Sequence, residues 1–391
     1  MSESMRRRKN VPSSSEDEHH HDHAHDHDHH HHRAREPRER TWCISLCTNL
    51  SYILVVFSIM FGMLIINERA SILRVLGDDQ PRILDFERKE LLSEKTSPSV
   101  HLLFVHGAFG NKDEWTQNFF PFFEKEVKSQ GKRIASLASF SMTGHGKSSH
   151  SDYISFLRLT DFVDDLESII EKHYNTIGSD ELVLACHSLG GMVCQKYLDV
   201  VSRSNIHKVV PRAVILLTSA PPVARMENAM SAIKFDPFIS FNMLMELKMD
   251  PIVMKTIKHT KHFLFHEKTT EEEVQKIAEK VPLSSEGILF YLDCLTTSIN
   301  TESIVSLLRS SEKKFDIAII SIEKDPFFSK NQHDKMTDYW KLVTSRVNEK
   351  TEKMHIREEI IPNSVQLGHQ VMLDKEWKVM AQKIQEFISK L

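Results

Sequence analysis

Hydrophobic and polar residues follow two different periods from residue 99 onward in this 391-residue chain. Short continuous apolar runs predict buried strands at residues 99–107, 134–140, 213–217 and 317–322, and in the run that ends at Ser188. Apolar positions at helical spacing predict helices at residues 115–128, 161–173 and 375–390. Because strands alternate with helices, the pattern predicts an α/β fold with a mostly parallel, doubly wound sheet covered on both faces.

The alternation stops between about residues 221 and 305, where the chain is rich in Met, Phe and Lys and has several helical stretches, one of them at 271–279. An insertion between two sheet strands would lie over the C-terminal strand ends, where α/β sheets bind ligands. We therefore expect a helical cap. Its Met and Phe side chains could line an acyl-chain pocket or pack the cap against the core.

A long uncharged segment precedes this region. From Cys43 to Ile66 no residue is charged, so residues 42–66 predict a single transmembrane helix, with a buried core helix as the alternative. Residues 67–98 are expected to form a polar connector. A slight excess of arginine before the segment favours a cytosolic N-terminus, which would place residues 99–391 in a lumen or outside the cell. We expect an endomembrane location of the endoplasmic-reticulum type.

Residues 1–41 contain almost no apolar side chains, so we expect a disordered tail. Ten histidines lie between His19 and His32, interleaved with aspartates. Such a tail could bind Zn²⁺ or similar ions weakly, or it could be solvated without a dedicated metal. The net charge of −4 gives no electrostatic basis for nucleic-acid binding.

Cysteine usage leaves the compartment open. Cys43 and Cys47 adjoin the predicted membrane boundary, where palmitoylation is possible. Cys186, Cys194 and Cys294 are odd in number and have no disulfide-type spacing. No Asn-x-Ser/Thr acceptor follows the apolar segment, which argues mildly against a glycosylated lumenal domain.

Candidate chemistry begins at Ser188, which ends an apolar run and is followed by Leu189, Gly190 and Gly191. This arrangement predicts a sharp strand-to-helix turn that exposes a nucleophilic hydroxyl. Gly107 and Ala108 follow an earlier strand, so the N–H groups of Ala108 and Leu189 are candidates for an oxyanion hole.

The other members of a catalytic triad have candidates later in the chain. Asp325 follows a buried strand and is preferred to Glu323 as the acid because Pro326 rigidifies its loop. His369 follows Gly368 just before the last predicted helix and is the candidate base. The remaining histidines fit less well: His187 is assigned a structural role, and three others are assigned to the surface or loops, namely His145, His333 and His355.

With these motifs in order, residues 99–391 resemble the α/β-hydrolase family. The resemblance rests on His106-Gly107-Ala108, on Gly144-His145-Gly146-Lys147-Ser148, on the Ser188 turn and on Gly368-His369. It implies a triad of Ser188, Asp325 and His369 that needs no cofactor or metal ion. Cys186 departs from the family pattern because it stands where glycine is usual, and Ser141-Met142-Thr143 departs before the Gly-His-Gly turn.

The leading hypothesis is a membrane-anchored serine hydrolase that cleaves an ester, thioester or amide of a lipid-like acyl substrate. Two alternatives stay open: a noncatalytic binding protein with this fold, and an acyltransferase that uses the same triad.

Overall fold

A computed structural model describes residues 82–92, 99–130, 133–176, 181–204, 208–222, 236 and 238–391. The predicted tail at 1–41, the predicted membrane segment at 42–66 and most of the connector lie outside these ranges. Within them, no helix combines the length and apolar character that a membrane crossing requires.

A seven-stranded sheet in the order β1-β3-β2-β4-β5-β6-β7 forms the centre of the described chain. All neighbouring strands pair in parallel except β1, which pairs antiparallel with β3 at one edge. The mostly parallel sheet expected from the sequence is confirmed. The strands are β1 (Phe86–Glu90), β2 (Val100–Val105), β3 (Ile134–Phe140), β4 (Glu181–His187), β5 (Ala213–Leu217), β6 (Phe315–Ile322) and β7 (Met354–Ile361).

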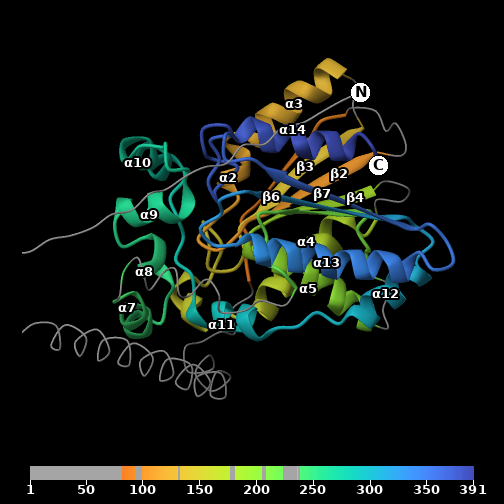
Figure 1. The fold of residues 1–391 in the computed structure, drawn as a ribbon, viewed down its shortest axis with the longest axis horizontal. Coiled ribbons are helices and arrows are strands. Elements are labelled where there is room, and N and C mark those ends of the chain that lie inside the picture. Colours follow the sequence, from red (N-terminus) through yellow and green to blue (C-terminus); the bar gives the residue numbers. More distant parts are fainter. Residues whose placement is uncertain are drawn as a thin grey trace, which may run out of the picture. The chain divides into compact units, whose positions relative to one another are not determined.

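Helices cover both faces of this sheet (Figure 1). On one face lie α2 (Asp113–Thr116), α3 (Phe119–Gln130) and α14 (Trp377–Ile388). On the other lie α4 (Leu159–Tyr174), α5 (Leu189–Arg203), α12 (Thr301–Ser310) and α13 (Lys330–Val347). Each face buries its own hydrophobic cluster, because the central strands β2, β4 and β5 are apolar on both sides.

Both edge strands were absent from the sequence prediction. β1 lies inside the predicted polar connector and has the sequence Phe-Glu-Arg-Lys-Glu, whereas β7 carries three consecutive charged residues, Arg357, Glu358 and Glu359. Edge strands often carry charge, which discourages pairing with other chains. Their polarity therefore hides them from a search for continuous apolar runs.

Between β5 and β6, the described residues 238–314 are mostly helical, as expected for a cap. They contain a short 8-residue helix, α7 (Ile239–Glu246), followed by α8 (Asp250–Val253), α9 (Ile257–Leu264), α10 (Glu271–Lys280) and α11 (Ile288–Thr296), before α12 returns to the sheet. Helix α10 begins at a capping box in which Thr270 and Glu273 bond each other's backbone N–H groups. A 3-10 helix, η1 (Ser151–Phe156), packs near α11.

The cap's Met and Phe residues do not share one environment. Met249 is buried and Met243 packs partly buried against the core, as a packing role predicts. Phe238 and Met245 are instead 69% and 68% exposed. Met226, Met230 and Phe235 lie outside the described residues.

Candidate active site

Ser188 lies at the turn between β4 and α5. Its backbone adopts φ 53° and ψ −125°, an unfavourable conformation for a residue with a side chain. The turn is held because the Ser188 carbonyl accepts hydrogen bonds from Gly191 N–H, Ala220 N–H and the Ser219 hydroxyl, at 3.0 to 3.1 Å. The strained turn therefore presents Ser188 at the end of a buried strand, as a nucleophile requires.

Two close approaches require glycine around this turn. A Cβ on Gly190 would lie 2.1 Å from the carbonyl oxygen of His106, so a side chain there would push α5 away from the β2 loop. A Cβ on Gly107 would lie 2.7 Å from the Cβ of Ser188. The glycines thus let the β2 loop pass directly beside the hydroxyl group.

The structure brings the three predicted triad residues together from separate loops. The Ser188 hydroxyl lies 2.8 Å from Nε2 of His369, and Nδ1 of His369 lies 2.9 Å from Oδ2 of Asp325. Asp325 is fixed in turn, because its Oδ1 accepts the N–H groups of Phe327 and Phe328. All three side chains are shielded from water. This chain of hydrogen bonds can move a proton from the hydroxyl to the imidazole.

Substitutions at Asp325 and Glu323 test which of these two residues is the acid of the triad. We expect Asp325→Asn to lower kcat by about 10⁴-fold because the imidazole loses the acceptor that orients it and stabilises its charge. Glu323 is exposed and accepts the Asn363 N–H, so Glu323→Gln should leave kcat within about twofold. Ester-hydrolysis kinetics of the two variants measure this difference, and an equal loss in both would contradict the assignment.

The candidate oxyanion donors belong to the two segments that adjoin Ser188. Ala108 follows Gly107 in the β2 loop, and Leu189 is the first residue of α5, where a helical N–H has no intrahelical acceptor. Both residues are partly buried. A substrate oxygen beside Ser188 could accept hydrogen bonds from both N–H groups.

His187 has a defined positional role in addition to the packing role assigned from the sequence. Its Nε2–H donates to the carbonyl oxygen of His369 over 2.9 Å. Burial, together with the nearby His369, holds the pKa of His187 well below its ordinary value, so the ring is neutral. The residue next to the nucleophile thus anchors the backbone of the candidate base, which no local sequence pattern indicates.

A buried carboxyl group links α2 to the loop that carries His369. Glu114 of α2 is 1% exposed, and it accepts a hydrogen bond from the side chain of Gln370. Burial raises the pKa of Glu114 to about 8, only partly offset by the Gln370 bond. The group is therefore protonated at neutral pH.

This raised pKa predicts a pH-dependent stability. A proton that is held more tightly in the folded state stabilises folding below the unfolded pKa, and the benefit is lost as pH rises toward 8. We expect the free energy of unfolding to fall by up to about 1.4 kcal/mol per pH unit between pH 5 and 8 from this group alone. Denaturant titrations of Glu114→Gln should lack that contribution. The exposed control Glu272→Gln should follow the parent protein, and a Glu114→Gln slope equal to the parent slope would refute the prediction.

His145 is not the surface or loop histidine expected from the sequence. It is fully buried, and its Nε2 lies 3.1 Å from Oε2 of Glu286, which is also fully buried and belongs to the cap segment. Burial alone would lower the pKa of His145, but the Glu286 carboxylate outweighs it and raises that pKa. The Gly-His-Gly turn therefore holds the cap by a buried ion pair. Sequence spacing could not reveal a partner so distant along the chain.

Of the other two histidines, His333 also differs from expectation. It is buried between the Ser321 hydroxyl and Glu358, whereas His355 is partly exposed. Neither contacts the candidate triad.

The prediction that the cysteines have no disulfide-type pairing is wrong. Cys186 and Cys194 form a buried disulfide that links the end of β4 to α5 across the Ser188 turn, and Cys294 is buried and free. The position where the family pattern has glycine thus carries one half of a crosslink. Spacing failed as a guide because the turn reverses the chain and brings residues of unrelated spacing together.

Within the described ranges, no three His, Cys, Asp or Glu side chains are grouped to hold a metal ion. The histidine-rich tail between His19 and His32 lies outside those ranges.

Comparison with known proteins concerns the fold and part of the sequence. Residues 102–274 match the model of the alpha/beta hydrolase family, from β2 through α10. No curated protein matches the sequence. Among solved structures, BpoC of Mycobacterium tuberculosis H37Rv, described as a non-heme bromoperoxidase, is 13% identical, with 79% of this chain and 96% of that chain covered at a TM-score of 0.51.

Two esterase structures are similar at lower scores. A carboxylesterase structure from Nitrososphaera gargenis is 15% identical, covering 80% of this chain and 97% of that one at a TM-score of 0.49. A thermophilic esterase from Thermogutta terrifontis is also 15% identical, covering 80% and 99% at a TM-score of 0.49. Residues 102–274 thus match the α/β-hydrolase family, and the sheet and the turn at Ser188 have the arrangement of the α/β-hydrolase fold.

Proposed function

We propose that the protein is a serine hydrolase that cleaves the carboxylic ester of a lipid-like acyl substrate. The observation that carries the proposal is the continuous hydrogen-bonded chain from the Ser188 hydroxyl through His369 to Asp325. That chain stands on a strained turn beside two candidate oxyanion donors, so nucleophile, base, orienting acid and charge stabilisation are available in one place.

The reaction proceeds in two halves. The Ser188 oxygen attacks the ester carbonyl carbon while Nε2 of His369 takes the hydroxyl proton, and the N–H groups of Ala108 and Leu189 bind the negative carbonyl oxygen. When the tetrahedral intermediate collapses, His369 gives its proton to the departing alcohol and an acyl-enzyme remains. Water then attacks the acyl group with His369 again as base, which releases the acid and restores Ser188.

The preference for a lipid-like substrate draws on two features. The predicted membrane segment at 42–66 would hold the enzyme at a bilayer, and the cap exposes the large apolar side chains of Phe238 and Met245. A series of p-nitrophenyl esters of increasing acyl length tests this preference. We expect kcat/KM to rise from acetate toward medium and long chains, and a preference for acetate would argue against it.

Hydrolysis and acyl transfer share the acyl-enzyme and differ in the acceptor. Product analysis with glycerol as a competing acceptor separates them, because hydrolysis yields free acid and transfer yields a new ester. We expect free acid to predominate. A binding protein without activity would give neither product.

For location, we propose a single membrane anchor with a cytosolic N-terminus and the hydrolase domain in the endoplasmic-reticulum lumen or a related compartment. The Cys186–Cys194 disulfide supports a lumenal position of the hydrolase domain, because disulfides persist in oxidising compartments such as the lumen. The exposed turn after α13 offers a test: Glu349→Asn creates an Asn-x-Thr acceptor with Lys350 and Thr351. In cells, a glycosidase-sensitive mass increase is expected, and an unglycosylated variant would contradict the proposed orientation.

A further inference from the structure

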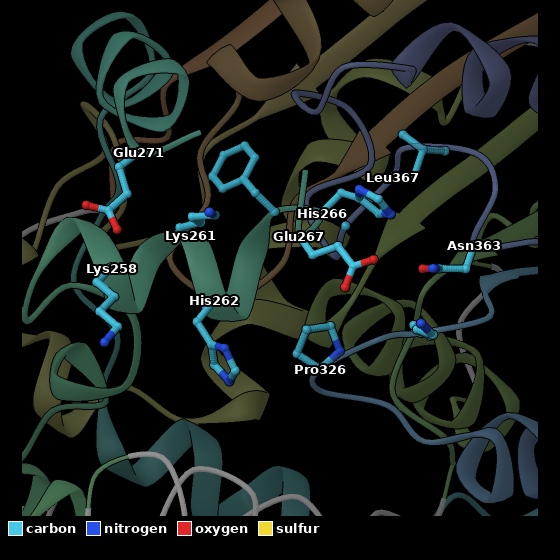
Figure 2. Close-up of a pocket in the computed structure, with 12 residues that line it drawn as sticks. Lys258, Lys261, His262, His266, Glu267, Glu271, Pro326, Asn363 and Leu367 are labelled. Atoms are coloured by element: carbon cyan, nitrogen blue, oxygen red, sulfur yellow. The ribbon is translucent and has the colours of Figure 1, made fainter. Parts of the chain in front are cut away.

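A pocket of about 410 Å³ lies where the cap meets the loops that carry Asp325 and His369. Figure 2 shows helix α9 with Lys258, Lys261 and His262 along one side of the pocket, and Pro326, Asn363 and Leu367 along the other. Lys324 and Pro326 flank Asp325 in sequence, and Gly368 precedes His369. A ligand here would therefore touch the cap and both loops at once.

The charged side chains of this pocket form no ion pair among the described residues. Lys258, Lys261 and Lys324 form no salt bridge with any residue in the part of the chain that the structure describes, and neither do Glu267 and Glu271. Three lysines against two glutamates leave one net positive charge when the imidazoles are neutral. Burial, together with His259 and Lys258, lowers the pKa of His262, so that ring does stay neutral at pH 7.

His266 adds a buried donor to the same pocket. The residue is 4% exposed, and its Nδ1 accepts the N–H of Lys268 over 3.2 Å. In the neutral ring the proton is therefore on Nε2, which is buried and has no hydrogen-bond partner among the described residues. A buried donor without an acceptor costs about 1–3 kcal/mol, so such a group commonly marks a place where a ligand or water binds.

An oxygen anion suits this pocket, because the lysines attract its charge and the Nε2–H of His266 is a buried donor without an acceptor among the described residues. We propose that this pocket binds the phosphate or carboxylate group of a small anionic ligand. Such a group can come from two sources: a free anion that occupies the pocket by itself, or an acidic group on the alcohol side of the ester substrate. The second source rests on the proposed function, and the first does not.

Binding of inorganic phosphate tests the pocket without catalysis. We would titrate phosphate into full-length Ser188→Ala protein by calorimetry at constant ionic strength. Adding Lys261→Gln and Lys324→Gln together should weaken phosphate binding about tenfold or more. Adding Lys280→Gln, which removes an exposed lysine of α10 outside the pocket, should leave the affinity unchanged.

A substitution that is expected to increase phosphate affinity distinguishes a direct effect on binding from damage to the fold. Glu267→Gln removes a negative charge from the pocket and should tighten phosphate binding about threefold to tenfold. A variant that merely disturbs the fold cannot produce tighter binding.

The substrate arm uses the catalytically intact protein and two esters that differ in one phosphate, 1-oleoyl lysophosphatidic acid and 1-monooleoylglycerol. If the anion is part of the substrate, the double lysine variant should raise KM for the phosphate ester about tenfold and leave KM for the neutral ester unchanged.

Four outcomes are decisive. A change in phosphate affinity with equal effects on both esters supports a free anion. A selective loss for the phosphate ester supports an acidic substrate. If neither phosphate affinity nor the ester ratio responds to the lysine and Glu267 substitutions, the anion pocket is overturned. If the protein binds phosphate as described but hydrolyses neither ester, the proposed function is contradicted and the anion-binding pocket still stands.

Discussion

Ser188→Ala should reduce ester hydrolysis by about 10⁴- to 10⁶-fold while leaving the fold intact. In the parent protein the Ser188 hydroxyl lies 2.8 Å from Nε2 of His369, which can take its proton. The variant has no hydroxyl at this position, so His369 has no nucleophile to activate. Residual activity would come from substrate binding and the oxyanion donors alone. Steady-state kinetics with a p-nitrophenyl ester measure the loss.

Ser202→Ala is the matched control for this substitution. Ser202 belongs to the same helix as the turn, but its hydroxyl only donates to the Asp199 carbonyl within α5. The kcat of the Ser202→Ala variant should stay within about twofold of the parent value. If Ser188→Ala retained a large share of the parent activity, another nucleophile would have to be sought.

The second large effect concerns the buried pair of His145 and Glu286. At pH 6, below the ordinary histidine pKa, His145 is charged because its pKa is raised, and we expect Glu286→Ala to lower the free energy of unfolding by about 3–5 kcal/mol because the imidazolium loses its buried counterion. The exposed cap residue Glu246 provides the control, and Glu246→Ala should change stability by less than about 0.5 kcal/mol. Urea denaturation of both variants gives the comparison.

The same pair predicts a pH dependence. A histidine whose folded pKa is raised stabilises the protein fully below pH 6.5, and this contribution is lost as pH rises through the folded pKa. In a double-mutant cycle, His145→Ala and Glu286→Ala should therefore show a coupling free energy that is larger at pH 6 than at pH 9. A coupling near zero at both pH values would show that the pair does not hold the cap.

The central part of the fold could be predicted because its strands are continuous apolar runs. The predicted strands at 134–140 and 213–217 coincide with β3 and β5, and the mostly parallel order follows from the alternation with helices. The edges could not be predicted in this way. β1 and β7 carry charged residues on partly exposed faces, so their strand character depends on neighbours far away in the sequence.

In the candidate site, too, some residues could be predicted from the sequence and others could not. Ser188, Asp325 and His369 each have a local signal, which is a turn, a loop after a strand or a glycine before the residue, and the structure brings them within hydrogen-bonding distance. The groups that hold them have no such signal. The contact between His187 and the His369 carbonyl joins residues 182 positions apart. The contact between Glu114 and Gln370 joins residues 256 apart, and only the folded chain reveals either contact.

Reaction with a fluorophosphonate probe tests whether Ser188 is an activated nucleophile, because the probe modifies only such a group. Folded full-length protein should acquire one phosphonyl group, and peptide mass spectrometry should place it on Ser188. Heat-denatured protein and the Asp325→Asn variant should react far more slowly. No labelling of folded protein, or labelling at a residue other than Ser188, would contradict the account.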